Sequence, residues 1–335
     1  MSRSLPLELL RTAPLPCMAA ALVACGTTTT TPAPRPGAAE MQAQPPESFA
    51  FPPPSRVHFS WTERRRFEAT LTPAAGGQAA GEPRERDESE LRWDVSMHPS
   101  VNDTTVVDER LVHVTIAHDG RTIVDGAPAA ADVQVVLDAG GNVQEVRGAD
   151  AASDAVRALA PPEAGGRGAP MLSAEGLRAI VTSRHDLFVG DVVGRPAQPG
   201  ATWIVPRKPG GNALLRRYTV ERPEACDGRG CSRLRVHIEL DPQALEPLAA
   251  RLVARRAAER DGAREPVSVE RARYAMDGAL LVDAAGLLPH GATLTEAAHA
   301  TLAGAGRAFV LDVRATTEDR YDYETPAAGA VSRGD

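Results

Sequence analysis

Two cysteines, Cys226 and Cys231, offer the clearest chemistry in this sequence. They flank the turn-prone segment 227–230, and an alternating apolar run lies on each side of it. In an oxidising compartment such a pair is typical of a disulfide at the end of a β-hairpin, where the short loop limits the entropic stabilisation to about 2 kcal/mol. Two alternatives stay open: a metal site that includes His237, for which no fourth ligand is evident, and a redox-active pair, although the spacing is not Cys-x-x-Cys. We favour the structural disulfide over both.

Other candidates for catalysis are dispersed along the chain. Eight histidines are spread out, and the sequence contains no His-Glu-x-x-His, Gly-x-Ser-x-Gly or calcium-loop motif. His113 and His118 could share a site with Asp108 or Asp119, but the sequence does not show what would orient them. Lys208 is the only lysine, and the residues before it do not form a phosphate-binding loop. We therefore predict a protein that is not an enzyme and that needs no cofactor or metal.

The N-terminus has the features of an export signal that ends at a modifiable cysteine. Residues 1–24 carry positive charge and a short apolar stretch, and Leu-Val-Ala immediately precedes Cys25. This arrangement resembles the signal of bacterial lipoproteins. The resemblance implies cleavage before Cys25, acylation of its thiol and anchoring in a lipid bilayer, while Gly26, which is not Asp, implies the outer membrane, facing the periplasm. The alternative is a chance Ala-Cys after an apolar run.

The segment that follows has the composition of a tether. Residues 25–54 contain five consecutive threonines and many prolines, and such a segment cannot bury enough apolar surface to fold. An extended proline-rich chain spans about 3 Å per residue, so this tether would reach roughly 80–90 Å. We expect a folded domain at 55–325, with possible halves at 55–190 and 191–325, and a frayed tail at 326–335.

Composition and charge narrow the possible functions of the folded part. The chain has 335 residues, of which 43% are hydrophobic and 24% charged, as in folded globular proteins. A formal net charge of −7, without a long basic stretch, argues against a general nucleic-acid-binding role. Aromatic residues make up only 4%, so we expect a core built mainly from Val, Leu and Ile.

Alternation of apolar and polar residues predicts many strands. Asp119-Gly120 and Asp277-Gly278 each separate two alternating runs and predict hairpin turns. The segment 291–302 favours helix by propensity, but a turn-like Gly-Ala-Gly and an alternating run follow it, so we predict a strand. The other expected strands cover residues 57–71, 91–97, 112–116, 133–137, 143–146, 267–276, 280–282 and 309–313.

Helical patterns occur mainly in the middle of the chain. A short amphipathic helix is predicted at 150–159, and Ser173 is a suitable N-cap for a second helix. The longest candidate, 242–261, has apolar residues at helical spacing and a flank of four arginines. That flank is either a solvated face or a surface that contacts anionic lipid headgroups.

These elements predict an α+β fold: a curved antiparallel β-meander with a few helices on one face. Two segments, around Asp119-Gly120 and Asp277-Gly278, share an order of strands and turns, which indicates either a duplication or the chance recurrence of Asp-Gly. The Val-Gly-Asp segment at 189–191 and the Pro-Gly-x-x-Trp step at 199–203 resemble uncharacterised bacterial lipoproteins, whose architecture is similar to the half-barrel of periplasmic lipoprotein carriers. The resemblance implies a fold but no activity.

Three functions are compatible with these observations. The first is a binding module whose concave sheet face holds an acyl chain or another apolar ligand, on residues such as Val112, Val114 and Ile116 or those near Phe309 and Leu311. The second is an envelope scaffold that binds another protein through a sheet face or edge. The third is a hydrolase assembled from dispersed residues. We favour a non-enzymatic protein that binds an apolar ligand or an envelope partner.

Overall fold

The computed structural model describes residues 47–51, 56–74, 84–100, 103–159, 173–207, 214–226, 229–240, 268–283, 285–304 and 307–323. The predictions for residues 1–24, for Cys25, for the helix at 242–261 and for the tail at 326–335 lie outside these residues, as does most of the tether. Residues 47–51, assigned above to the tether, lie against the domain. Phe49 is buried, its backbone N–H donates to the Arg195 carbonyl at 2.9 Å, and its ring lies 6.2 Å from that of Trp203.

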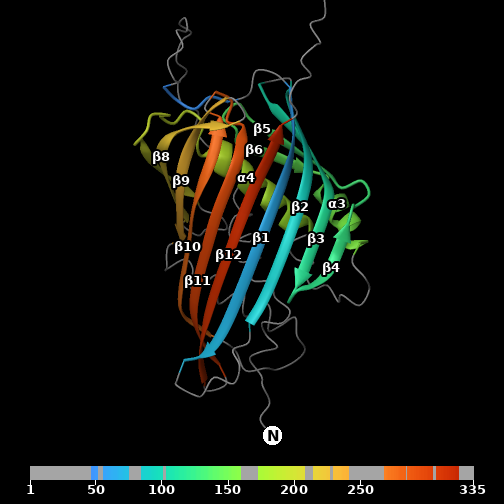
Figure 1. Cartoon of the computed structure of the whole chain (residues 1–335), viewed down its shortest axis with the longest axis vertical. Helices are drawn as coiled ribbons and strands as arrows, with labels where there is room; N and C mark the ends of the chain where they lie inside the picture. Colours follow the sequence, from blue (N-terminus) through green and yellow to red (C-terminus); the bar gives the residue numbers. More distant parts are fainter. Residues whose placement is uncertain are drawn as a thin grey trace, which may run out of the picture.

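In the described residues, twelve strands form one antiparallel sheet, as the alternation predicts (Figure 1). Their order across the sheet is β6-β5-β3-β2-β1-β12-β11-β10-β9-β8-β7, and β4 pairs with β3 alone. The first and last of the described strands, β1 and β12, therefore pair in the middle of the sheet. The bounds are β1 Val57–Pro73, β2 Arg84–Pro99, β3 Thr105–His118, β4 Arg121–Gly126, β5 Asp132–Leu137, β6 Val143–Arg147, β7 Thr202–Arg207, β8 Leu214–Cys226, β9 Arg229–Leu240, β10 Ser268–Asp283, β11 Pro289–Gly304 and β12 Arg307–Tyr323.

Between β6 and β7, the described part of the chain contains three helical segments: α3 (Ala149–Arg157), α4 (Ala174–His185) and the π-helix η2 (Asp186–Gly190). Helices α3 and α4 lie on one face of the curved sheet (Figure 1) and contact β5 and β6. The predicted cap is present, because the Ser173 side chain accepts a hydrogen bond from the Gly176 backbone N–H at 3.0 Å. The predicted α+β fold with a curved antiparallel meander is therefore confirmed. Among the described residues, no helix has the length and hydropathy needed to cross a membrane.

The turn predicted at Asp119-Gly120 and the strand predicted at 291–302 are both confirmed. Asp119 and Gly120 both have positive φ, 48° and 74°, and join β3 to β4 in a two-residue turn. The segment 291–302 lies within β11, which pairs with β12 as far as Gly304 opposite Arg307. Tertiary pairing along the sheet thus outweighs the helix propensity of this alanine-rich segment.

The predicted turn at Asp277-Gly278 is wrong. Both residues lie in the middle of β10, and Gly278 pairs with Val236 of β9 and Leu294 of β11. A Cβ atom on Gly278 would lie 2.3 Å from the Thr293 carbonyl oxygen, so the glycine permits a close approach of β11 and does not form a turn. The suggested correspondence with Asp119-Gly120 therefore has no structural basis at this position.

The described core is built mainly from Val, Leu and Ile, as expected, and several of the few aromatic side chains cluster within it. On the face that carries the helices, Trp61 stacks on Trp93 with ring centroids 5.7 Å apart and on Tyr321 at 6.2 Å. Phe188 of η2 contacts the Tyr321 ring edge-on at 5.7 Å. The few aromatic residues thus concentrate where η2 meets the sheet, together with Phe59. We call this cluster the aromatic end of the inner face.

Candidate functional site

The inner face of the sheet is the face that carries α4 and η2. Residues with odd numbers on β1 and β12 point to it, and the cross-strand pairs Trp61–Tyr321, Glu63–Asp319 and Ala69–Val313 follow one another along it. Passing along β1, the face changes from aromatic to charged and then to small and apolar. These three zones form the candidate binding surface.

Four charged residues cross the middle of the inner face, and we call them the polar belt: Glu63, Arg65, Glu296 and Asp319. Arg65 of β1 reaches across β12 to Glu296 of β11, with Nη2 3.0 Å from Oε1. The two side chains are only 12% and 10% exposed. Charges this enclosed require partners, because desolvation penalises an unpaired ion heavily.

Glu63 and Asp319 lie directly opposite each other on β1 and β12. Burial and the charge of Glu63 raise the pKa of Asp319 well above its usual range. Burial also raises the pKa of Glu63, against the opposing effects of Arg65 and Arg184. Trp61 Nε1 donates to Asp319 Oδ1 at 3.2 Å. Because double ionisation of neighbouring, desolvated carboxyls is unfavourable, the pair retains protons to a higher pH than isolated carboxyls do.

The C-terminal end of α4 is attached to the sheet on the aromatic side of the belt. Arg184 lies 3.9 Å above the Trp61 ring and bonds to the fully buried carboxylate of Glu109 on β3. His185 Nε2 also donates to Glu109 Oε1, at 3.0 Å. Burial and the charge of Arg184 lower the pKa of His185 well below its usual range, which keeps the imidazole neutral. These contacts position α4 over the aromatic end.

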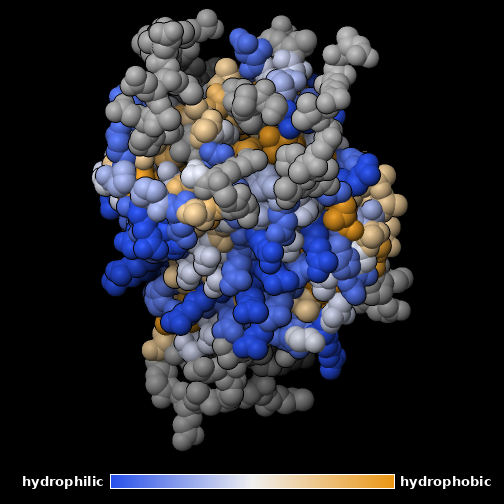
Figure 2. All heavy atoms as spheres, turned by 45° about the horizontal axis from the view of Figure 1, so that its top comes forward, coloured by the Kyte–Doolittle hydropathy of each residue, from blue (hydrophilic) through white to orange (hydrophobic). Residues whose placement is uncertain are grey.

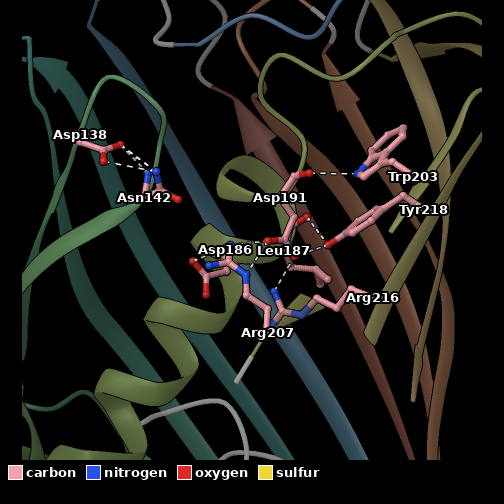
Figure 3. A network of polar contacts seen from close by, with 9 residues as sticks. All are labelled: Asp138, Asn142, Asp186, Leu187, Asp191, Trp203, Arg207, Arg216 and Tyr218. Carbon is pink, nitrogen blue, oxygen red and sulfur yellow. Dashed lines mark hydrogen bonds and ion pairs between the residues drawn. The ribbon is translucent and has the colours of Figure 1, made fainter. Parts of the chain in front are cut away.

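A second buried network surrounds Asp191, which follows η2 (Figure 3). Its carboxylate accepts hydrogen bonds from Arg207 Nε at 2.8 Å, Arg216 Nη1 at 2.8 Å and the Tyr218 hydroxyl at 2.9 Å. Its backbone carbonyl accepts a hydrogen bond from Trp203 Nε1 at 3.0 Å. The carboxylate is fully buried and its oxygens are saturated with donors, which is typical of a structural joint between η2 and strands β7 and β8.

This network shows that the two short sequence motifs have a structural role. The Val-Gly-Asp segment ends at Asp191, and the Pro-Gly-x-x-Trp step ends at Trp203, and the two residues are hydrogen-bonded to each other. Gly190 belongs to η2, and a Cβ there would lie 3.5 Å from Arg207 Nη2. The motifs therefore join the helical middle to the second group of strands.

Beyond the belt, the inner face becomes apolar, and we call this zone the apolar end. Its side chains are small compared with the aromatic end, since four of them are alanines. The zone consists of Phe67, Ala69, Val269, Ala272, Ala298, Ala300, Leu302, Phe309, Leu311 and Val313. Helix α3 packs mainly against β5, and α4 against β6. This zone is therefore a buried apolar surface that continues directly from the belt, with small side chains at four of its positions.

The outer face of the central strands is hydrophilic. Figure 2 shows hydrophilic side chains over the middle of the surface in that view, with apolar side chains in smaller patches. On β1, Arg64 and Arg66 are exposed, and Arg64 Nε lies 2.8 Å from Glu90 Oε2 of β2. An apolar ligand would therefore find its complement on the inner face.

The candidate residues from the sequence occupy separate places. Phe309 and Leu311 lie at the apolar end, whereas Val114 and Ile116 lie on β3 opposite Leu91 and Ser89. Val112 falls at an irregularity in the β2–β3 register. The suggested surface is thus divided between two regions of the sheet.

The suggested histidine site is divided as well. His118 Nδ1 lies 2.6 Å from Asp87 Oδ1, and its Nε2 lies 3.4 Å from Asp119 Oδ2. His113 instead contacts the Gly126 carbonyl at 2.9 Å and Asp125 at 3.3 Å. The two histidines therefore do not share one set of partners.

Cys226 and Cys231 lie within bonding distance of each other, with their Cα atoms 5.9 Å apart. Only residues 227 and 228 separate β8 from β9, so the hairpin is tighter than the four-residue loop expected from the sequence. His237 does not join the pair, because its Nδ1 lies 2.7 Å from Asp277 Oδ1 on the exposed side of β9. The histidine that lies near the two cysteine sulfur atoms is His290. The disulfide itself stays a prediction.

Sequence reasoning missed the polar belt, although a signal was present. On β1 the inward positions run Phe59, Trp61, Glu63, Arg65, Phe67, so two charges interrupt an otherwise apolar alternation. Charged residues at core positions of a strand are unfavourable for folding alone and so indicate a possible functional site. The partners on β11 and β12 could not be identified without the strand register.

No family model matches this sequence, and no curated protein matches it. Among solved structures, lipovitellin, from a study of lipid–protein interactions, aligns with 83% of this chain at 11% identity and a TM-score of 0.38. An outer membrane channel from Pseudomonas putida F1 aligns over 84% of this chain and 100% of its own, at 8% identity and a TM-score of 0.20. The outer membrane protein OprG from Pseudomonas aeruginosa aligns over 82% and 99%, at 8% identity and 0.16. The chain spans 26% of the lipovitellin chain, and TM-scores at this level do not establish a shared fold for any of the three.

Proposed function

We propose that this protein is a non-enzymatic, lipid-anchored protein of the cell envelope whose inner sheet face binds an amphiphile with an acyl chain. The observation that carries the proposal is the adjacency of the polar belt and the apolar end on one continuous face. An amphiphile has the matching arrangement, because its polar head is joined to an apolar chain.

The energetics favour a ligand of this class. Each methylene group transferred from water to the apolar end would contribute about 0.8 kcal/mol before the costs of association. The belt supplies donors and acceptors at one end of that surface, with Arg65 as the cation and Glu63, Glu296 and Asp319 as carboxyl groups. A polar head placed there would avoid burial among apolar side chains.

The decisive experiment is native mass spectrometry of the full chain purified from a bacterial periplasm or envelope, followed by solvent extraction. We expect a reproducible, non-covalently bound lipid. The variant Ala300→Phe should lose it, because Ala300 is a buried inward residue of the apolar end. The matched control Ala297→Phe lies on the same strand but is exposed, and should retain the lipid. Circular dichroism confirms that both variants are folded.

Other outcomes would change the assignment. A wild-type protein free of lipid would contradict the proposal, and recovery of an envelope protein by crosslinking would then favour the scaffold function. Equal retention of lipid by both alanine variants would also contradict it, because the lipid would then bind elsewhere.

The anchor is tested separately. We propose that the mature chain begins at an acylated Cys25 and resides in the outer membrane, facing the periplasm, where two acyl chains would give stable attachment. The variant Cys25→Ala should appear in the soluble periplasmic fraction. Sedimentation of this variant with membranes, as for the wild type, would show that the attachment lies elsewhere in the chain.

A further inference from the structure

Three groups suited to a soft metal ion converge at one end of the β8–β9 hairpin. The sulfur atoms of Cys226 and Cys231 and a ring nitrogen of His290 all lie within 4.8 Å of one another. The three residues come from β8, β9 and the beginning of β11, so the sheet brings together positions far apart in the sequence. This grouping is independent of the polar belt and of the apolar end.

The surroundings hold the three groups in place. Cys226 and Cys231 are 8% and 2% exposed, and His290 is partly buried. The ring of Tyr323 lies 4.8 Å from the His290 ring, and the Tyr323 hydroxyl donates to the Pro289 carbonyl at 2.5 Å. Tyr323 of β12 therefore packs against the imidazole ring and is hydrogen-bonded to the residue that precedes it.

We infer that, when the cysteine pair is reduced, Cys226, Cys231 and His290 bind one thiophilic monovalent cation of the Cu⁺ type. A thiol reductant opens the sulfur–sulfur bond: two reductant thiols supply two electrons and two protons, the protein gains two thiols, and the reductant becomes a disulfide. Binding of the cation then displaces the two thiol protons, and the two thiolates and one neutral imidazole nitrogen coordinate it.

The ligand set selects the class of ion. Thiolates favour soft cations such as Cu⁺, and imidazole is compatible with them. A structural Zn²⁺ site needs four protein ligands, and this cluster supplies three among the residues that the structure describes. The oxidised pair offers no thiolate, so the site exists only in the reduced protein and its occupancy depends on the redox state.

The test uses Ag⁺, which has the same preference for sulfur. All proteins carry Cys17→Ser and Cys25→Ser in the full chain, because these two thiols would bind silver themselves. Reduced and oxidised samples are desalted anaerobically, and bound silver is measured by mass spectrometry and by competition with a chromophoric chelator. We expect one Ag⁺ per reduced chain and none in the oxidised chain.

His290 distinguishes this site from a simple dithiol. His290→Ala should weaken Ag⁺ binding at least tenfold. If the alanine variant does not fold, His290→Gln, which preserves more of the packing, is tested for the same loss of affinity. His237→Ala is the matched control, since His237 pairs with Asp277 away from the cluster, and should bind as the parent does. Parental affinity in the folded His290 variant, binding by the oxidised chain, or stoichiometric Zn²⁺ in place of Ag⁺ would each overturn the inference.

Discussion

Replacement of Gly141 by alanine tests how the β5–β6 turn contacts η2. Gly141 has a φ of 73°, and a Cβ atom there would lie 2.2 Å from Val189 Cγ1. The left-handed backbone costs a non-glycine residue about 1–2 kcal/mol, and overpacking in a dense interior adds about 1–3 kcal/mol. We therefore expect Gly141→Ala to lower the free energy of unfolding by about 2–5 kcal/mol.

Gly120→Ala provides the matched control for backbone strain. Gly120 has nearly the same φ, 74°, but a Cβ atom there would meet nothing within 4 Å, so only the cost of the left-handed backbone applies. Urea unfolding followed by circular dichroism measures both variants. Adding Val189→Ala to Gly141→Ala should recover part of the loss, because it removes the atom that the new Cβ would strike. Equal destabilisation by the two glycine variants, without this coupling, would refute the proposed contact between the turn and η2.

Two further predictions concern the charged networks. A carboxyl whose pKa is raised in the folded state keeps its proton after the unfolded chain has lost its own, so stability falls as the pH rises from the ordinary aspartate pKa through the folded value. Asp319→Asn should remove the Asp319 part of this loss and flatten the fall in stability, measured by urea unfolding, as the pH rises above the ordinary aspartate pKa; parallel profiles for variant and wild type would contradict the raised pKa. Tyr218→Phe should keep the stacking on Trp203 at 5.2 Å but remove one donor to Asp191, which lowers stability by about 1–3 kcal/mol in the same urea assay, and an unchanged midpoint would show that the hydroxyl does not matter.

Local patterns predicted the elements of this fold well. Alternation identifies a strand because its side chains have a period of two, and β1 shows this pattern except where Glu63 and Arg65 occupy inward positions. Asp119-Gly120 was correctly identified as a turn because both residues tolerate positive φ. Asp277-Gly278 is the same dipeptide, but it lies within a strand, where β11 packs closely against Gly278. That contact involves residues distant in the sequence, so the local pattern does not reveal it.

The candidate sites depended on long-range pairing and were only partly predictable. The sequence suggested that His237 could join the cysteines, whereas the sheet places His290 there, from a strand that begins more than fifty residues later. The Asp191 network shows the same limit, because Asp191 and Trp203 stand in recognisable motifs but Arg216 and Tyr218 join them only through the pairing of β8. Register selects these partners, and register follows from the whole sheet.

The polar belt is difficult to explain by stability alone. Valine or leucine at Glu63 and Asp319 would fit the strand alternation and would avoid the desolvation that raises both pKa values. The hydrogen bond from Trp61 and the Arg65–Glu296 pair offset only part of this cost, since buried ion pairs rarely stabilise more than well-packed apolar residues do. The position of the belt, between an aromatic end filled by its own side chains and an apolar end lined with alanines, supports a role in holding the polar head of a bound amphiphile. On that view the charges specify where the polar head of the ligand lies, and the apolar side chains beyond them contact its acyl chain.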